Sequence, residues 1–86
     1  MKTKKDKLYS FDHTRKRLAE RYGIEIQSID YTELCSRINK KKDVKFVSEE
    51  KQKKDIQQIY DITFRGATVR VVWSMANRYI KTVLPI

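Results

Sequence analysis

The spacing of apolar residues predicts a helix near the beginning of the chain. Apolar positions recur at helical intervals from Phe11 onward, which is typical of a helix that packs one side against a core. Gly23 follows directly after this run, and glycine readily adopts the left-handed conformation in which many helices end. We therefore expect a first helix over about residues 12–22. Residues 1–10 are rich in lysine and lack the periodicity, so they are expected to form a flexible basic arm.

A second helix is predicted from the pattern at its start. Asp30 and Glu33 have the spacing of a capping box, and Ile29 and Leu34 have the spacing of a hydrophobic staple. The residues expected to face the core are Tyr31, Leu34, Cys35 and Ile38. The helix is expected to end in the polar residues 39–42.

The second half of the chain changes from helical spacing to the alternation of a sheet. A short strand is expected at residues 44–47, followed by a charged and mobile loop at residues 49–55. Apolar and polar residues then alternate over residues 60–65 and again, after Gly66, over residues 68–74. These two segments are predicted to form a hairpin.

A turn at Arg65 and Gly66 would fix the register of this hairpin, because a two-residue turn leaves only one way to pair the strands. This register puts apolar residues opposite each other on one face and opposite charges on the other. The expected pairs are Ile62 with Val69, Tyr60 with Val71, and Asp61 with Arg70.

A second turn around residues 76–77 is expected to start the last strand, which ends at Pro85. The pairs expected across this turn are Trp73 with Ile80 and Val71 with Thr82. The side chains expected on the reverse face of the sheet, away from the helices, are Asp61, Arg70, Tyr79 and Lys81.

Together these elements predict an α+β fold. Two N-terminal helices would pack on one face of a four-stranded antiparallel sheet. A chain of 86 residues has room for one hydrophobic core, so we expect a single domain over residues 11–86.

The net charge favours a polyanionic partner. Twenty Lys and Arg against eleven Asp and Glu give a net charge of +9. Such an excess raises the local concentration of polyanions and speeds encounter with them. The alternative is a surface that only keeps the protein in solution.

Few residues are suited to metal or redox chemistry. Cys35 is the only cysteine and His13 the only histidine, which excludes an internal disulfide and leaves too few ligands for a zinc site. We therefore expect no metal and no cofactor. No apolar run approaches membrane-spanning length, so we expect a cytoplasmic protein without a membrane segment.

One class of catalysis remains compatible with these residues. Cleavage of RNA by attack of its own 2′-hydroxyl needs a proton acceptor, a proton donor and cations, and no metal. His13, Arg17 and Arg21 lie four residues apart, which aligns an imidazole with two guanidinium groups on one helix face. The alternative is that His13 caps the start of the helix and the arginines form a solvated stripe.

The reverse face of the sheet offers a second set of cations. Arg70 and Lys81 could bind phosphates while Tyr79 stacks on a base, a combination typical of single-stranded RNA binding. The alternative is an ion pair between Asp61 and Arg70 on a hydrated face. The further candidates for nucleic-acid contacts are Lys16 and Lys41. Lysine clusters are, however, also typical of solvated loops.

Two segments resemble small phage and bacterial domains related to RelE-type toxins. The first is residues 11–24, FDHTRKRLAERYGI, and the second is residues 79–85, YIKTVLP. The resemblance implies membership of the broader barnase, EndoU, colicin and RelE group of folds, in which a helix pair leads into a four-stranded antiparallel sheet. Metal-independent ribonucleases are prominent in this group. The catalytic candidates that it implies by position are His13, Arg17, Arg70, Tyr79 and Lys81, and no glutamate base can be assigned.

The leading interpretation is an RNA-binding domain of RelE-like fold, with metal-independent RNA cleavage as an activity that the residues permit. The residues assigned to phosphates are Arg17, Arg21, Arg70 and Lys81. His13 or Tyr79 would move protons. The alternative is a non-catalytic, phage-encoded inhibitor or regulator that binds a host protein of nucleic-acid processing or defence. RNA is favoured over DNA as the partner.

Overall fold

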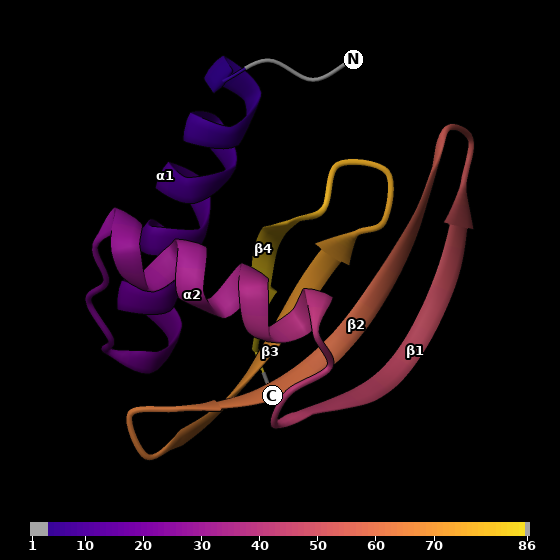
Figure 1. Ribbon diagram of the computed structural model, residues 1–86. Coiled ribbons are helices and arrows are strands. Elements are labelled where there is room, and N and C mark those ends of the chain that lie inside the picture. Colours follow the sequence, from indigo (N-terminus) through magenta and orange to yellow (C-terminus); the bar gives the residue numbers. More distant parts are fainter. Residues whose placement is uncertain (1–3, 86) are drawn as a thin grey trace.

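The computed structural model describes the backbone of residues 4–85 and the side chains of residues 9–85. Its elements are α1 (Lys4–Tyr22), α2 (Ser28–Asn39), β1 (Val44–Gln52), β2 (Asp55–Phe64), β3 (Ala67–Ser74) and β4 (Tyr79–Leu84). The strand order is β1-β2-β3-β4 and each neighbouring pair is antiparallel (Figure 1). The predicted fold class is confirmed, with two N-terminal helices and a four-stranded antiparallel meander.

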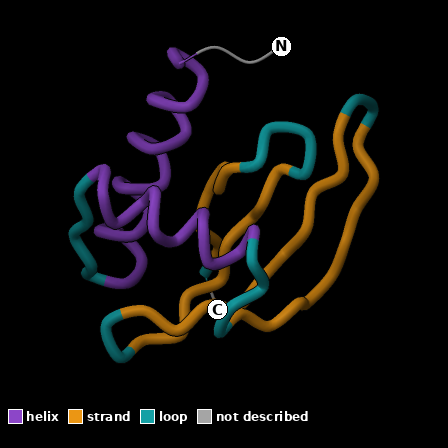
Figure 2. The backbone as a smooth tube through the Cα atoms, viewed as in Figure 1, coloured by secondary structure: helices purple, strands orange, loops and turns teal. Residues whose placement is uncertain are grey.

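The helices cover one side of the sheet. α2 crosses that face, and α1 lies beside β4, against which it packs (Figures 1 and 2). The hairpin of β1 and β2 extends past the helices on the right of the view. Every residue of β1 after Val44 is exposed, so this strand contributes little to the core.

The core forms where α2 meets the inner face of the sheet. The four α2 residues predicted to be buried, Tyr31, Leu34, Cys35 and Ile38, are all buried, which confirms that prediction. The Tyr31 hydroxyl donates a hydrogen bond to the Ile80 carbonyl oxygen at 2.7 Å. Burial raises the pKa of Tyr31 above its ordinary value, so this hydroxyl is protonated at neutral pH and can donate.

Helix α1 begins at Lys4, so the predicted start near Asp12 is wrong. The apolar periodicity begins at Phe11, but lysine is a good helix former and can extend a helix that has no apolar stripe. Ser10, in the segment expected to be a basic arm, is buried. Residues 1–3 lie outside the described residues, and the independent motion expected of residues 1–10 stays a prediction.

The predicted end of α1 is confirmed. Gly23 follows Tyr22 with a φ of +67°, the left-handed conformation that a glycine adopts without strain. The Gly23 amide donates to the Ala19 carbonyl at 3.1 Å, and the Ile24 amide donates to the Leu18 carbonyl at 3.3 Å. These bonds satisfy carbonyls that the end of the helix would otherwise leave free.

The start of α2 lies earlier than predicted. Gln27 is the capping residue, and the Asp30 carboxylate accepts a hydrogen bond from the Gln27 amide at 2.8 Å. Asp30 is therefore the third helical residue of the capping box, whereas the sequence predicted that it would be the capping residue itself. The predicted staple is wrong as well, because the Ile29 side chain is 74% exposed.

The hairpin of β1 and β2 replaces the predicted charged loop. β1 continues to Gln52 and β2 begins at Asp55, so residues 49–52 are paired strand residues. Backbone hydrogen bonds to β2 hold this segment extended although its side chains are charged and exposed. A strand that buries neither face shows no apolar alternation, which is why the pattern at residues 49–55 indicated a loop.

The hairpin of β2 and β3 has the predicted register. Arg65 and Gly66 have φ values of +50° and +78°, as a type I′ turn requires. The confirmed pairs are Ile62 with Val69, Tyr60 with Val71, and Asp61 with Arg70.

The pairing of β3 with β4 is confirmed in part. Trp73 pairs with Ile80 as predicted, but Val71 pairs with Val83 where Thr82 was expected. The register shifts between Val72 and Trp73, which leaves Lys81 as the extra residue on β4. A bulge of this kind cannot be read from apolar alternation alone.

Candidate nucleic-acid interface

One side of the first helix carries two rings and two guanidinium groups, of which Tyr9 and Arg21 are exposed and His13 and Arg17 are half-buried. We call Tyr9, His13, Arg17 and Arg21 the α1 row, since they follow one another at intervals of four residues. The Tyr9 side chain is 72% exposed, and its ring stacks on His13 with centroids 6.2 Å apart and planes inclined by 10°. The structure therefore brings the predicted His13, Arg17 and Arg21 together on one helix. Sequence reasoning missed Tyr9, which the same spacing would have found if the helix had been extended.

Among the α1 residues whose side chains the structure describes, acids contact three of the four cations, Arg15, Lys16 and Arg17. Arg17 contacts Glu20 at 2.7 Å, and Lys16 contacts Asp12 at 3.3 Å. The pKa of Asp12 is lowered by hydrogen bonds from Arg15 and Lys16. Exposed pairs of this kind contribute little to stability, because water and salt screen them. Arg17 can therefore exchange Glu20 for a phosphate at small cost.

Arg21 is held differently from the rest of the α1 row. One of its terminal nitrogens donates to the Val83 carbonyl oxygen at 2.6 Å, which ties the end of α1 to β4. The guanidinium carries five N–H donors, so this contact leaves others for a ligand. Arg21 thus has a fixed position at the end of the row.

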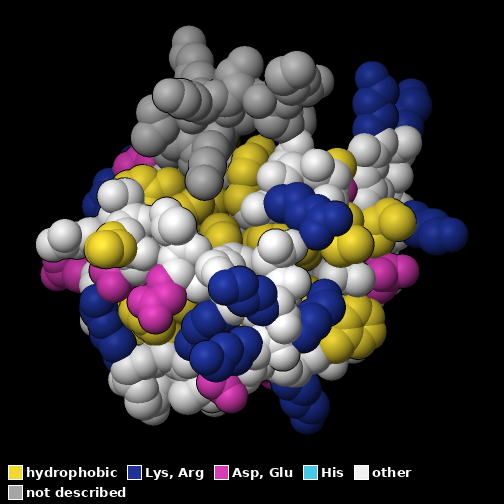
Figure 3. All heavy atoms as spheres, in the orientation of Figure 1, with side chains coloured by type: hydrophobic (Ala, Val, Ile, Leu, Met, Phe, Trp, Pro, Cys, Tyr) yellow, Lys and Arg dark blue, Asp and Glu magenta, His cyan; other side chains and the backbone are white. Residues whose placement is uncertain are grey.

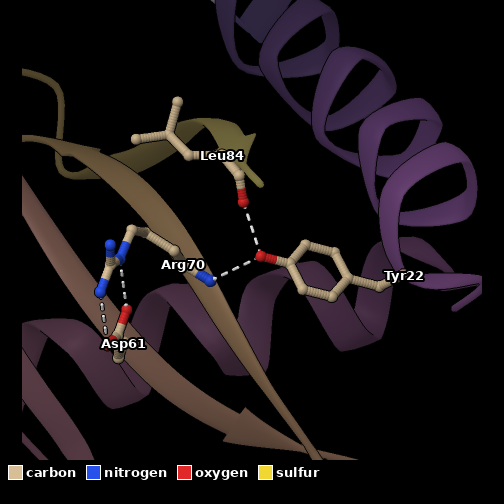
Figure 4. A network of polar contacts seen from close by, with 4 residues as sticks. All are labelled: Tyr22, Asp61, Arg70 and Leu84. Carbon is tan, nitrogen blue, oxygen red and sulfur yellow. Dashed lines mark hydrogen bonds and ion pairs between the residues drawn. The ribbon is translucent and has the colours of Figure 1, made fainter. Parts of the chain in front are cut away.

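Arg70 forms a cross-strand ion pair, as the alternative interpretation of the reverse face expected. Its Nε and Nη2 atoms contact the two carboxylate oxygens of Asp61 at 2.9 Å and 3.1 Å (Figure 4). These hydrogen bonds from Arg70 lower the pKa of Asp61. The bidentate geometry occupies the guanidinium edge that a phosphate would need.

Tyr22 joins the end of α1 to the same region of the sheet. Its hydroxyl accepts a hydrogen bond from the Arg70 amide at 3.2 Å and donates one to the Leu84 carbonyl at 2.6 Å (Figure 4). It therefore links α1 to β3 and β4 at a single point. The contact positions the α1 row relative to the sheet.

We expect Tyr22→Phe to lower the free energy of unfolding by about 1 kcal/mol, because the Arg70 amide and the Leu84 carbonyl lose a shared partner. Urea unfolding followed by circular dichroism would measure the change. Tyr9→Phe is the matched control, since the Tyr9 side chain is 72% exposed and should change stability by less than about 0.5 kcal/mol. Equal stability of Tyr22→Phe and the unchanged protein would contradict a structural role for the hydroxyl.

Tyr79 is buried, so its predicted position on the exposed reverse face is wrong. Its side chain is only 6% exposed and belongs to the core cluster that contains Tyr31. Tyr79 pairs with Ser74, and the neighbouring pair Trp73 and Ile80 is buried as well, so this end of β3 and β4 is covered on both faces. It cannot stack on a base from this position.

The catalytic candidates are divided among three elements: α1 carries His13 and Arg17, β3 carries Arg70, and β4 carries Tyr79 and Lys81. Lys81 is half-buried, and its charge acts on Asp55. His13 lies in the α1 row, Arg70 is paired with Asp61, and Tyr79 is in the core. Within the described part of the chain, no hydrogen bond or ion pair joins any two of these five residues.

A second cationic region lies where α2 leads into β1. The Lys41 ammonium contacts the Tyr60 hydroxyl and lies 4.7 Å from the centre of the Tyr60 ring. Phe46 meets Tyr60 edge-on with centroids 5.7 Å apart, and its side chain is 52% exposed. Figure 3 shows Lys and Arg side chains in dark blue around this end of α2, with exposed apolar side chains beside them. Sequence reasoning singled out Lys41 but missed Phe46, because exposure cannot be read from a strand that buries neither face.

The lysines of this region differ from the α1 cations in their pairing. Lys40 and Lys42 form no ion pair with any described residue. Lys45 is directed toward the reverse face, where its charge acts on Asp61. The uncompensated positive charge of residues 9–85 therefore lies partly on the connection between α2 and β1.

The remaining findings concern metals, membranes and relatives. Among the residues described, no three His, Cys, Asp or Glu side chains gather as metal ligands would. Neither described helix has the length and apolar character needed to cross a membrane. No family model, curated protein or solved structure matches the chain.

Proposed function

We propose that this domain binds RNA through the α1 row. The observation that carries the proposal is the succession of two stacked rings, Tyr9 and His13, and two guanidinium groups, Arg17 and Arg21, along one side of α1. Rings that stack on bases next to cations that contact phosphates are the usual means of binding single-stranded nucleic acid. The net charge of +9 adds long-range attraction to the same ligand.

The choice of RNA over DNA rests on the resemblance to RelE-type toxins, and a relation to that group is part of the proposal. The chain shares with the group a pair of helices followed by a four-stranded antiparallel sheet. Ribonucleases are prominent in the group. Fold likeness does not carry a reaction by itself. We therefore propose binding without cleavage, since Tyr79, one of the two residues expected to move protons, is buried, and Arg70 is held by Asp61.

We expect the unchanged protein to bind a labelled single-stranded RNA with an affinity that falls steeply as salt rises. Arg17→Gln should weaken binding and reduce the slope of log affinity against log salt by about 0.7, because one phosphate contact is lost. Tyr9→Ala should weaken binding about fivefold or more through loss of stacking. Fluorescence anisotropy over a series of salt concentrations measures both effects.

Arg15→Gln is the matched control for Arg17→Gln. Arg15 lies on the same helix, two residues from Arg17 and hence on a different face, and it contacts Asp12 at 2.6 Å. Its affinity for RNA should stay within about twofold of the unchanged protein, because losing a cation away from the row removes only long-range attraction. An equal loss in both variants would show a general charge effect and overturn the α1 row as the binding surface.

The same samples test for cleavage. We expect the labelled RNA to remain intact on a denaturing gel at high protein excess. Cleavage that disappears in both His13→Ala and Arg70→Ala would overturn the binding-only proposal and establish a ribonuclease.

One observation favours the alternative function, a protein-binding inhibitor or regulator. β1 is an edge strand of nine residues, and no other strand among residues 4–85 pairs with its outer side. Phe46 and Val47 on it are 52% and 37% exposed. Such an edge can accept a strand of a partner protein. Absence of salt-dependent RNA binding would favour this function.

A further inference from the structure

We infer that Lys41, Phe46 and Tyr60 form a second binding subsite, which takes one unpaired base and its adjoining phosphate. We call these three residues the base subsite. The inference rests on the proposed function, because it specifies which part of a single-stranded RNA binds at the junction of α2 and β1. It does not depend on the α1 row being the other contact.

The Phe46 ring is exposed but firmly placed. About half of its side-chain surface is open, at 52% exposure, while one side of the ring rests edge-on against Tyr60. Tyr60 is itself only 1% exposed. Its hydroxyl donates to Gln58 Oε1 at 2.7 Å and contacts the Lys41 ammonium. A ring supported in this way loses little freedom when a base stacks on it.

The backbone that carries Lys41 is also fixed. Arg37 donates to the Thr63 carbonyl at 2.8 Å and to the Asp43 carbonyl at 2.9 Å, so the connection between α2 and β1 is anchored to β2. Lys41 and Asp43 both have a φ of +56°, which gives the connection a tight path. The lysines therefore have a defined position relative to the Phe46 ring.

The charges around the ring favour an anionic strand over a peptide. Lys40 and Lys42 flank Lys41 and form no ion pair with a described residue. Two acidic residues lie nearby: Asp43 follows Lys42 in the connection, and Glu49 shares the Phe46 face and accepts a hydrogen bond from Gln58 at 2.8 Å. The three lysines exceed the one acid of the connection. A phosphate is thus favoured on the lysine side of the ring and disfavoured on the Glu49 side. An aromatic ring next to uncompensated cations is the chemistry of a stacked nucleotide.

The decisive experiment compares two probes that differ only in their bases. The first is a labelled oligouridine RNA, and the second is an abasic strand of the same length with the same phosphates. We expect Phe46→Ala to weaken binding of oligouridine about five- to tenfold and to leave binding of the abasic strand unchanged. Phe46→Tyr should bind oligouridine as tightly as the unchanged protein does, since a tyrosine ring also stacks on a base.

Controls separate the subsite from general effects on charge and folding. Val47→Ala removes a neighbouring exposed apolar side chain and should leave both affinities unchanged. Lys41→Gln should weaken binding of both probes and reduce the salt slope by about 0.7, because a phosphate contact is lost. Lys53→Gln, at the turn of the β1–β2 hairpin, is its matched control and should leave that slope unchanged.

The outcomes distinguish the subsite from the proposed function. Salt-dependent binding of oligouridine that Phe46→Ala leaves unchanged would overturn the base subsite and leave the α1 row standing. An equal loss for both probes in Phe46→Ala would also overturn the subsite, because the effect would then be on folding or charge. Failure of the unchanged protein to bind either probe would overturn the proposed function together with the subsite.

Discussion

Ile38→Ala is expected to lower the free energy of unfolding by about 3 kcal/mol, because it removes three carbon atoms from a closed core. Ile38 has no exposed surface and lies on the inner side of α2. A domain of this size is held by only about 5–10 kcal/mol in total. The single substitution should therefore remove a large share of the stability and bring the urea midpoint down with it.

Ile29→Ala is the matched control for Ile38→Ala. Ile29 is the same residue type on the same helix, but its side chain is 74% exposed. We expect a change within about 0.5 kcal/mol, since little surface is removed from or returned to water. The fluorescence of Trp73, the only tryptophan and a buried one, reports the unfolding of all variants. Equal losses for the two substitutions would contradict the orientation of α2.

This pair of isoleucines also shows what apolar spacing can predict. The four buried positions of α2 follow helical spacing closely, so the core side of the helix was predicted correctly. Ile29 lies in the first turn, where an apolar residue fits a staple and a surface position equally well. Its exposure depends on where the chain enters the helix, and that path is fixed by tertiary packing.

The strand pairs also differ in how far the sequence predicts them. Tight turns such as Arg65 and Gly66 fix a register through local backbone conformation, so the pairs across β2 and β3 were predicted correctly. The bulge at Lys81 and the length of β1 follow from contacts between strands. Those contacts leave no signature in residue type. The features that sequence could not predict are therefore those set by pairing between strands, both at the exposed β1 and at the buried end of β4.

The candidate site could be predicted only where one element holds all its residues. His13, Arg17 and Arg21 share a helix, so their spacing alone aligns them. The surroundings of Arg70 and Tyr79 could not be predicted in this way, because they depend on which parts of the sheet are covered and on which residues lie opposite. The net charge of +9 is a sum over the chain, and it does not reveal that Arg70 is paired while Lys40 and Lys42 are not.

The pairing of charges changes which surface is best suited to a polyanion. Acids on α1 and β2 form ion pairs with several arginines, whereas the three lysines between α2 and β1 form no ion pair with a described residue. The α1 row supplies rings and guanidinium groups, and the base subsite supplies a supported ring and ammonium groups. A single strand that contacted both would be read by stacking at two places, with phosphates contributing most of the affinity.

Asp55→Ala is expected to lower the free energy of unfolding by about 2–3 kcal/mol at neutral pH, because one carboxylate accepts three hydrogen bonds. The groups that donate to the Asp55 carboxylate are the Ser74 hydroxyl at 2.6 Å, the Ala76 amide at 2.9 Å and the amide of the next residue, Ile56, at 2.7 Å. Ser74 has no exposed surface, so its hydroxyl loses a partner that water cannot easily replace. The contact ties the start of β2 to the turn between β3 and β4.

The pH dependence of this loss has a defined sign. Burial acts to raise the pKa of Asp55, but the hydrogen bonds from Ser74, Ala76 and Ile56 outweigh it and lower the pKa from its ordinary value of 3.8. A carboxyl group with a lowered folded-state pKa stabilises the fold fully above its unfolded-state value and loses that contribution as the pH falls through the folded-state value. The difference between the unchanged protein and Asp55→Ala should therefore be largest at neutral pH and shrink below about pH 4.

A double-mutant cycle with Ser74→Ala isolates the interaction between the two side chains. If the Asp55 carboxylate acts through the Ser74 hydroxyl, the two substitutions together should cost at least about 0.5 kcal/mol less than the sum of the single ones. Urea unfolding at pH 7 and at pH 3 measures both the coupling and its loss in acid. Two results would contradict the proposed role of the charged Asp55 in joining β2 to the turn between β3 and β4. One is strict additivity at pH 7, and the other is a stability difference between the unchanged protein and Asp55→Ala that stays constant down to pH 3.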